Sequence, residues 1–483
     1  MSKLVKILLV FLLLFVVLGV VAALVLRTRL TEDSIVADVE RALDCRVQIG
    51  SHESVLVGGP ASLTLHDLVV APRDAVVDAG TPHSEREPIG ETSEALKAER
   101  VDLELSLTGF LKKRIDVEQL VFHGLDLQLV IDEKGDDNIQ PLLRKPKKKT
   151  DLGEKAGTDD PKKKKKKRGR LAIPTTIDRI GIESGKIVIK NAKQGSETRL
   201  ENLHLILSDI DIDANSLEEH NHCRADLSTH LILSNTDTRE TFLDFQISGD
   251  AEGSPLDPAD GLFGPNMVFN AKIDEGGWVA GLPFLHTLSN SLEALDKIGL
   301  NLDFLGMRGE LAQPLDTKVR VADKKLVFEK PAKLDFGSYA VGIENASWID
   351  TAALQHDFRG GISLSEGFTK TATDGVETFL REKAGKRAAE MGLEAIIDPL
   401  VESGRLSLIF KSTGSLSKPE VGLANEIGDV ESVMEEVGKR LIRSLRGDDP
   451  DDDSNDPPEP DESDKPESEG KGTLKGLFKD LLE

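Results

Sequence analysis

The chain has 483 residues, 39% of them hydrophobic, and a formal net charge of -24. This length is enough for a large domain or two, and the negative charge argues against a nucleic-acid surface because it repels phosphates. The two cysteines, Cys45 and Cys223, lie far apart in the sequence. We expect two isolated core cysteines, with one disulfide as the alternative in an oxidising compartment.

The first thirty residues indicate a membrane anchor. Residues 7–26 form an uninterrupted run without a charge, about the length that spans a bilayer core as a helix. The run is too long for the apolar part of a cleaved signal peptide and lacks a clean cleavage site, so we predict a retained anchor, with a cleaved signal as the alternative. Lys3 and Lys6 precede the run, whereas Arg27 and Arg29 after it are followed by acidic residues. This slight bias favours a cytoplasmic N-terminus with the bulk of the chain outside.

A short helix and a series of strands are predicted after the anchor. Thr31 can cap a helix over residues 31–43, where Ile35 and Val39 share a face. Alternating apolar and polar residues then predict strands, because successive side chains of a strand point to opposite faces. The predicted strands are Cys45 to Ile49, Ser54 to Val57, Leu63 to Val70, Val101 to Leu107, and Leu120 to Ile131 with a break at His123-Gly124.

The broken strand pattern recurs about sixty residues later. Residues 180–189 alternate around Glu183-Ser184-Gly185 as residues 120–131 alternate around His123-Gly124. We interpret these glycine-containing breaks as turns between short strands. Further predicted strands are Leu203 to Leu207, Ala225 to Leu233, Leu243 to Ile247, Met267 to Ile273, Leu315 to Val321, and Leu406 to Phe410.

Composition divides the chain into segments. Residues 144–171 are rich in lysine and cannot bury a core, so they read as a solvated loop between two β regions. Residues 425–446 have helical apolar spacing, and we expect this helix to pack on the sheet rather than form a coiled coil. The predicted segments are 1–29 (cytoplasmic stub and anchor), 30–143 (first β region), 144–171 (Lys-rich loop), 172–424 (second β region, with helices near 284–298 and 373–398), 425–446 (amphipathic helix), 447–471 (disordered acidic tail) and 472–483 (short amphipathic helix).

The sequence offers little for catalysis. His220-Asn221-His222-Cys223 could supply metal ligands, but a turn with solvated histidines is the preferred interpretation because no second cluster has zinc-site spacing. The alternating acidic residues Asp209, Asp211 and Asp213 fit the solvent-exposed face of a strand better than a calcium-binding loop. Nucleophile-elbow, phosphate-loop and zinc-protease motifs are missing from the sequence. We therefore expect a protein that is not an enzyme and uses no cofactor or metal.

Several sequence segments, taken in their order along the chain, resemble the AsmA family. After the anchor and the short helix come Leu63 to Val70, Ala98 to Leu105 and Ile115 to Phe122, which look like the start of that family. Ile131 to Asn138, a strand followed by an acidic turn with glycine and an asparagine, looks like the end of the same block. The phrase Gly414 to Pro419 is similar to the family's C-terminal phrase.

Up to Leu143 the resemblance extends to specific sequence segments. From Ile177 to Leu423 it is limited to the general strand pattern, and the lysine run and the acidic tail depart from the family pattern. It implies a member of the bridge-like lipid transfer group, anchored in the inner membrane with most of the chain in the periplasm. Movement of phospholipid toward the outer membrane, or support of outer-membrane assembly, would follow. The implied fold is mainly β with a few helices: an N-terminal transmembrane helix, an elongated, curved antiparallel sheet forming an apolar groove, C-terminal helices and a disordered acidic tail.

The strand pattern by itself points in a similar direction. The apolar strand faces exceed what two or three helices could cover, so they must face each other in a sandwich or face a lipid, which gains about 0.8 kcal/mol per buried CH₂. About 15 to 18 strands would span only about 70 to 85 Å, which suggests a shuttle or one subunit of a longer path. The alternative is a closed sandwich that serves as a non-enzymatic, membrane-tethered scaffold for outer-membrane protein assembly.

The expected binding surfaces follow from these patterns. Six consecutive lysines could hold anionic headgroups or the acidic surface of a partner; the alternatives are a solvated insert or a contact for the chain's own acidic tail. These residues are Lys162, Lys163, Lys164, Lys165, Lys166 and Lys167. The terminal helix could lie on a membrane, enter a partner's groove or remain a frayed end. The expected partners are phospholipids, the inner membrane through residues 7–26, and envelope assembly proteins through the C-terminal tail. The candidate groove residues are Leu103, Leu105, Leu107, Leu125, Leu127, Leu129, Ile187, Ile189, Leu203, Leu205, Leu207, Leu231, Phe245, Phe269, Leu408 and Phe410.

Overall fold

A computed structural model describes residues 31–139, 174–280 and 308–423, apart from short gaps. The chain forms two compact units, the first from residues 1–280, 310–332 and 344–356, the second from residues 281–309, 333–343 and 357–483. Within the described ranges, no helix is both long and apolar enough to span a membrane. The predicted anchor, the lysine run and the predicted elements at 284–298, 425–446, 447–471 and 472–483 lie outside the described residues.

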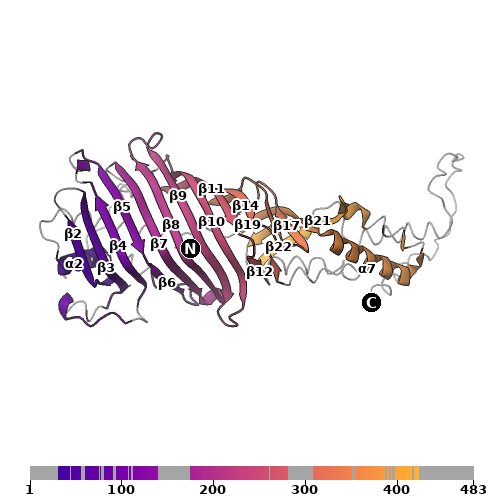
Figure 1. Cartoon of the computed structure of the whole chain (residues 1–483), viewed down its shortest axis with the longest axis horizontal. Coiled ribbons are helices and arrows are strands. Elements are labelled where there is room, and N and C mark those ends of the chain that lie inside the picture. Colours follow the sequence, from indigo (N-terminus) through magenta and orange to yellow (C-terminus); the bar gives the residue numbers. More distant parts are fainter. Residues whose placement is uncertain are drawn as a thin grey trace, which may run out of the picture. The chain divides into compact units, whose positions relative to one another are not determined.

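Strands dominate the first unit, where α2 (Glu32–Ala42) is the one α-helix among the described residues. The mainly β prediction is therefore confirmed. The strands are β1 (Cys45–Gln48), β2 (Ser51–Val55), β3 (Ala61–Pro72), β4 (Leu96–Leu105), β5 (Ile115–His123), β6 (Asp126–Ile131), β7 (Thr175–Asn191), β8 (Ser196–Ile212), β9 (Asn221–Asn235), β10 (Thr241–Leu256), β11 (Phe263–Ile273), β12 (Trp278–Val279), β14 (Leu315–Ala322), β15 (Lys325–Phe328) and β18 (Trp348–Asp350). Figure 1 shows β3, β4, β5, β7, β8, β9, β10 and β11 side by side in this order.

The sheet of the first unit is mostly antiparallel, as expected, but two of its strand pairs are parallel, so the sheet is mixed. Strands β5 and β6 both pair with β7 in the parallel direction, whereas the other pairs of this unit in the described ranges are antiparallel. Each parallel pair joins residues sixty positions apart, such as Val117 with Ile177 and Leu127 with Ile187. The long connection between Ile131 and Thr175 allows this, because parallel neighbours need a crossover of a dozen or more residues. The sixty-residue repeat in the sequence is thus a pair of neighbouring strands.

The glycine-containing breaks are not turns, because β5 and β6 keep one register beside β4 and β7 across His123-Gly124, and the break at Ser184 is a β-bulge. The chain keeps its direction through Ser184, where the pairing of β7 with β8 shifts register. Asp67, Gly124, Ser184 and Asn202 all have a φ between 51° and 59°. The strand registers place these four residues next to one another across β3 to β8. We call these four residues the left-handed line. Register shifts occur along it between β7 and β8 and between β8 and β9, and a bulge at such a shift bends its strand and increases the local twist.

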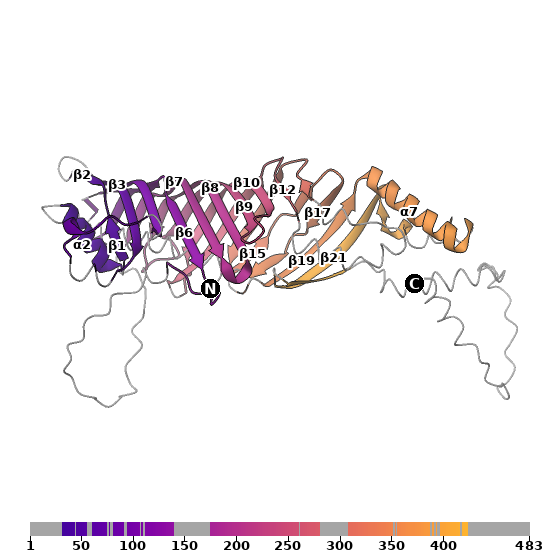
Figure 2. The same cartoon turned by 90° about the horizontal axis from the view of Figure 1, so that it is seen from below.

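Helix α2 lies at the N-terminal end of this sheet beside β1 (Figure 2). The predicted cap is present, because Thr31 Oγ1 accepts a hydrogen bond from the Ser34 N–H at 3.3 Å. Ile35 and Val39 are buried in the same apolar cluster as the strands. The helix therefore covers apolar strand side chains at this end of the unit.

The second unit combines a small sheet with one long helix. Strands β17 (Tyr339–Ile343), β19 (Gln355–Leu364) and β21 (Arg405–Ser415) are neighbours, and β22 (Lys418–Leu423) completes a hairpin with β21. Helix α7 (Glu366–Ala384) contacts β21, and the Leu406 N–H donates to Thr369 Oγ1 at 2.9 Å. The predicted helix near 373–398 begins earlier than expected, directly after β19, and α7 ends at Gly385, whose φ of 87° suits glycine. Beyond Gly385 the described residues Lys386, Ala389, Glu390 and Leu393 are again helical. Four short elements are β13 (Gly309–Glu310), β16 (Ala332–Asp335), the 3₁₀ turn η6 (Asp398–Leu400) and β20 (Val401–Glu402).

Candidate functional site

One face of the first sheet carries apolar side chains across successive strands, and we call it the apolar face. Residues that are partners across antiparallel or parallel pairs project to the same side of a sheet, so a register can be followed from strand to strand. From β3 to β15 one such row is Leu63, Leu103, Leu120, Ile180, Leu207, Ala225, Ala251, Phe269, Val319 and Phe328.

The apolar face continues on the other side of the left-handed line. A shift of one residue would turn every apolar side chain to the opposite face. The alternation itself skips a position at this line, because buried Leu68 follows buried Leu65 in β3, and buried Leu125 follows buried Phe122. Two rows of this second part are Leu127, Ile187, Leu200, Leu231 and Phe245, then Leu129, Ile189, Thr198, Leu233, Leu243 and Val279. The left-handed line therefore interrupts the alternation, and the apolar side chains on both sides of it share one side of the sheet.

Burial changes along the apolar face. In β3 to β7 the side chains are sealed, as with Leu63 and Ile180, which are 1% and 0% exposed. From β8 onward many are half-buried, among them Leu205, Leu207 and Leu227. Large apolar side chains left partly open to water on adjacent strands are an unusual feature of a soluble fold and point to a binding surface.

The predicted groove residues fall into three groups. Those in the sealed part are Leu103, Leu105, Leu125, Leu127, Leu129, Ile187, Ile189 and Leu203. Those on β8 to β11 are Leu205, Leu207, Leu231 and Phe269, which are half-buried, and Phe245, which is buried. Leu408 and Phe410 belong to the core of the second unit and are each 1% exposed, while Leu107 and Lys162 to Lys167 lie outside the described residues. The candidates therefore divide between a sealed and a half-buried part of the first unit and the core of the second unit.

Sequence reasoning missed several members of the half-buried part. Leu227 pairs with Leu205, Leu233 with Thr198, and Leu243 with Leu233. All three lie in strands that the alternation predicts, but alternation alone does not say which register brings them beside Leu205 or Leu207. The registers needed to group them come from the tertiary structure.

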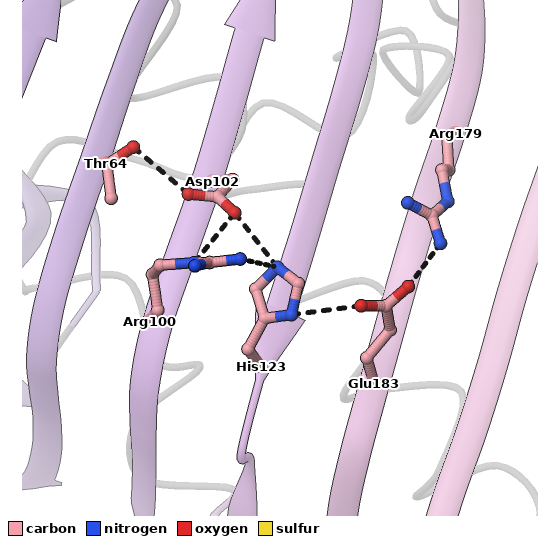
Figure 3. A network of polar contacts seen from close by, with 6 residues as sticks. All are labelled: Thr64, Arg100, Asp102, His123, Arg179 and Glu183. Carbon is pink, nitrogen blue, oxygen red and sulfur yellow. Dashed lines mark hydrogen bonds and ion pairs between the residues drawn. The ribbon is translucent and has the colours of Figure 1, made fainter.

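The opposite face is polar, and a network of six residues crosses it (Figure 3). His123 lies between two carboxylates, with Nε2 at 2.9 Å from Asp102 Oδ2 and Nδ1 at 3.0 Å from Glu183 Oε2. The flanking members are Thr64, Arg100 and Arg179, of which Thr64 donates to Asp102, Arg100 pairs with Asp102, and Arg179 pairs with Glu183. Each carboxylate is thus matched by a donor or cation, as expected for a network that joins β3, β4, β5 and β7.

The histidines considered as metal ligands point to separate partners. His220 Nδ1 lies 2.7 Å from Asp211 Oδ2, and this hydrogen bond raises the pKa of His220. His222 faces Glu252, whereas Cys223 is buried against Met267, and burial raises the pKa of its thiol to about 11. Across the described ranges, no group of three His, Cys, Asp or Glu side chains is placed to hold a metal ion. Both cysteines are buried and neither forms a disulfide, which confirms the expectation of two core cysteines rather than one disulfide.

Comparison with protein families decides the relationship of the chain. The model of the AsmA family matches residues 1–357. The chain belongs to the AsmA family. The family match ends beside the last residue of the first unit, His356, so the Gly414 to Pro419 phrase lies beyond it. Comparison with curated proteins gives no match.

Proposed function

We propose that this AsmA-family protein holds the acyl chains of phospholipids against the half-buried part of its apolar face and takes part in lipid transfer within the cell envelope. The observation that carries this proposal is the partly exposed apolar row on β8 to β11, including Leu205, Leu207 and Leu227. Covering such side chains with an acyl chain would remove water from both surfaces at about 0.8 kcal/mol per CH₂. This contact requires no bond-making step, so the proposed role is binding and transfer rather than catalysis.

The proposed setting is the inner membrane, with residues 7–26 as a single-pass anchor and the bulk of the chain in the periplasm. The composition of that run and the family membership support this placement. Lipid carried by the apolar face would then contribute to outer-membrane biogenesis. The acidic C-terminal tail is a candidate contact for envelope assembly proteins.

A scaffold for outer-membrane protein assembly is the competing role. The sealed side chains of β3 to β7 suit such a role, because a filled core offers no room for a lipid. The half-buried side chains from β8 onward favour lipid binding, because a closed scaffold has no use for apolar surface open to water.

The test uses the full chain purified gently from cells, with bound lipid measured by native mass spectrometry and lipid extraction. The double variant Leu205→Asn, Leu227→Asn changes two cross-strand partners on the apolar face. We expect phospholipid in a defined ratio on the unchanged protein and at least a tenfold loss in this variant, because two apolar contacts become polar.

The matched control is His204→Asn, Ser228→Asn, which changes the adjacent cross-strand pair on the other face of the same strands. It should retain lipid as the unchanged protein does. A folded, lipid-free protein, or equal lipid in both double variants, would overturn the proposal and favour the scaffold.

A further inference from the structure

A polar pocket lies on the face opposite the apolar face, where β7 to β10 reach their connecting turns. Its volume is about 420 Å³, and its lining includes Lys190, Glu197, Arg199, Ser234, Arg239 and Thr241. Lys190 pairs with Glu197, Glu197 with Ser234, and Ser234 with Thr241, so these four residues form one row across the strands. The two turns are joined by a hydrogen bond from the Thr236 N–H to the Gly195 carbonyl at 3.0 Å. The pocket is therefore formed by paired strands and by two turns that a hydrogen bond connects.

The pocket has more positive than negative charge. Three cations line it, Lys190, Arg199 and Arg239, against the single carboxylate of Glu197. Within the part of the chain that the structure describes, Lys190 and Arg239 form no ion pair. The acidic Asp237 and Glu240 of the nearby turn are hydrogen-bonded to Thr236 and Thr238 and do not line the pocket. An excess of cations is notable in a chain whose formal net charge is -24.

Arg199 has an unused donor. Its Nε is 3.5 Å from Glu197 Oε1 and its Nη1 is 3.6 Å from Glu201 Oε1, so both carboxylates lie beyond good hydrogen-bond distance. Nε is buried and has no hydrogen-bond partner among the described residues. A buried donor without a partner costs free energy, and a guanidinium suits the several oxygens of a phosphate. The chemistry that fits is therefore a phosphate group.

The pocket lies next to the apolar face at the strand ends. Ile189, Thr198 and Leu233 alternate with Lys190, Glu197 and Ser234 along β7, β8 and β9, so the last apolar row and the pocket occupy opposite sides of the same strand ends. Strands β7 and β9 end at Asn191 and Asn235, and the turns that follow form the edge of the sheet between its two faces. A molecule whose acyl chains lie on the apolar face could reach around this edge and place a phosphate in the pocket on the opposite face.

The geometry points to a headgroup site: the pocket of Lys190, Arg199 and Arg239 binds the phosphate of a phospholipid whose acyl chains lie on the apolar face. This inference rests on the proposed function for the acyl chains, whereas the phosphate site rests on the pocket itself. A soluble phosphate ester shares the same chemistry and is the other source that the experiment must distinguish.

The experiment measures binding to the full-length protein in amphipol by isothermal titration calorimetry. The probes are dihexanoyl phosphatidic acid, dihexanoyl glycerol and glycerol 3-phosphate, which carry chains with phosphate, chains alone and phosphate alone. The variant Lys190→Gln, Arg239→Gln removes two exposed cations from the pocket. We expect it to weaken phosphatidic acid binding about tenfold and to leave dihexanoyl glycerol binding unchanged.

The matched control is Lys186→Gln, Lys193→Gln, which removes the same charge from exposed positions in β7 and in the short 3₁₀ turn after it, outside the pocket lining. It should bind all three probes within twofold of the unchanged protein. Equal weakening by both double variants, or no preference for phosphatidic acid over dihexanoyl glycerol, would overturn the headgroup site.

The remaining arms separate the two proposals. Glycerol 3-phosphate that binds as tightly as phosphatidic acid would make this a site for a soluble phosphate ester and overturn the lipid assignment. If dihexanoyl glycerol fails to bind the unchanged protein, the proposed acyl-chain function fails, and glycerol 3-phosphate still reports on the pocket through its sensitivity to Lys190→Gln, Arg239→Gln.

Discussion

At the residue scale, one buried ion pair holds α2 in place. Glu40 is 8% exposed and accepts hydrogen bonds from Arg86 Nη1 at 3.0 Å to each carboxylate oxygen. The Val47 N–H donates to the same carboxylate at 3.0 Å, and Arg86 Nε donates to the Thr81 carbonyl. The pair therefore connects the helix, β1 and the loop after β3, and its strength depends on both partners being present.

We expect Arg86→Met to lower the free energy of unfolding of the first unit by about 3 kcal/mol, because it leaves the Glu40 carboxylate buried without its cation. Urea unfolding followed by tryptophan fluorescence measures this, since both tryptophans, Trp278 and Trp348, lie in the first unit. The control Arg100→Met removes a guanidinium that is 47% exposed and should cost less than about 1 kcal/mol. Equal losses for the two variants would contradict the role of burial.

Among the elements, the long strand β7 continues through a bulge at Ser184. Glycine in a sequence favours a break, and on that basis the sequence predicts a turn at Glu183-Ser184-Gly185. The strand instead continues to Asn191, because residues on both sides of Ser184 pair with the same neighbours, β8 and the β5–β6 pair. Local residue preference cannot distinguish a bulge from a turn when the pairing partner is sixty residues away.

Ser184 provides a direct test, because its φ of 56° is in the left-handed region. Ser184→Val should destabilise the first unit by about 1 to 2 kcal/mol, since a β-branched side chain is strained there. Ser184→Gly should be neutral or stabilising, because glycine accepts this backbone without strain. Both are measured by urea unfolding with tryptophan fluorescence, and a stable valine variant would show that Ser184 does not hold this conformation.

At the scale of the whole first unit, the apolar face has two parts with different burial. The sealed part, together with Ile35 and Val39 of α2, forms a core that stabilises the unit. The half-buried part from β8 to β11 uses the same residue types but leaves them partly open. One continuous sheet face can thus supply both a core and the proposed lipid-binding surface.

This division predicts where a bound acyl chain lies. The full chain, loaded with a phospholipid that carries a photoreactive diazirine in its acyl chain, should be labelled mainly in peptides from residues 196–273. The reason is that Leu205, Leu207 and Leu227 are accessible, whereas side chains such as Leu63 and Leu103 are covered. Mass spectrometry of the digested protein gives the labelled positions. Label concentrated in residues 61–131 would place the lipid in the sealed part and contradict the assignment.

The strand-rich class, the positions of most strands and the cap at Thr31 can be predicted from the sequence, because alternation and capping are local properties of neighbouring residues. The sequence also contained the repeat at about sixty residues, and its phrases were sufficient to indicate the AsmA family. These features do not depend on which strands pair.

Three features require the tertiary structure: the parallel pairing of β5 and β6 with β7, the bulge at Ser184, and the division of the apolar residues between a sealed core and a half-buried surface. Each depends on register between segments far apart in the chain. Leu103 and Leu205 follow the same alternation in the sequence, yet one is covered and the other partly open. The cations Lys190, Arg199 and Arg239 form a pocket for the same reason, because strand pairing and turns bring them together.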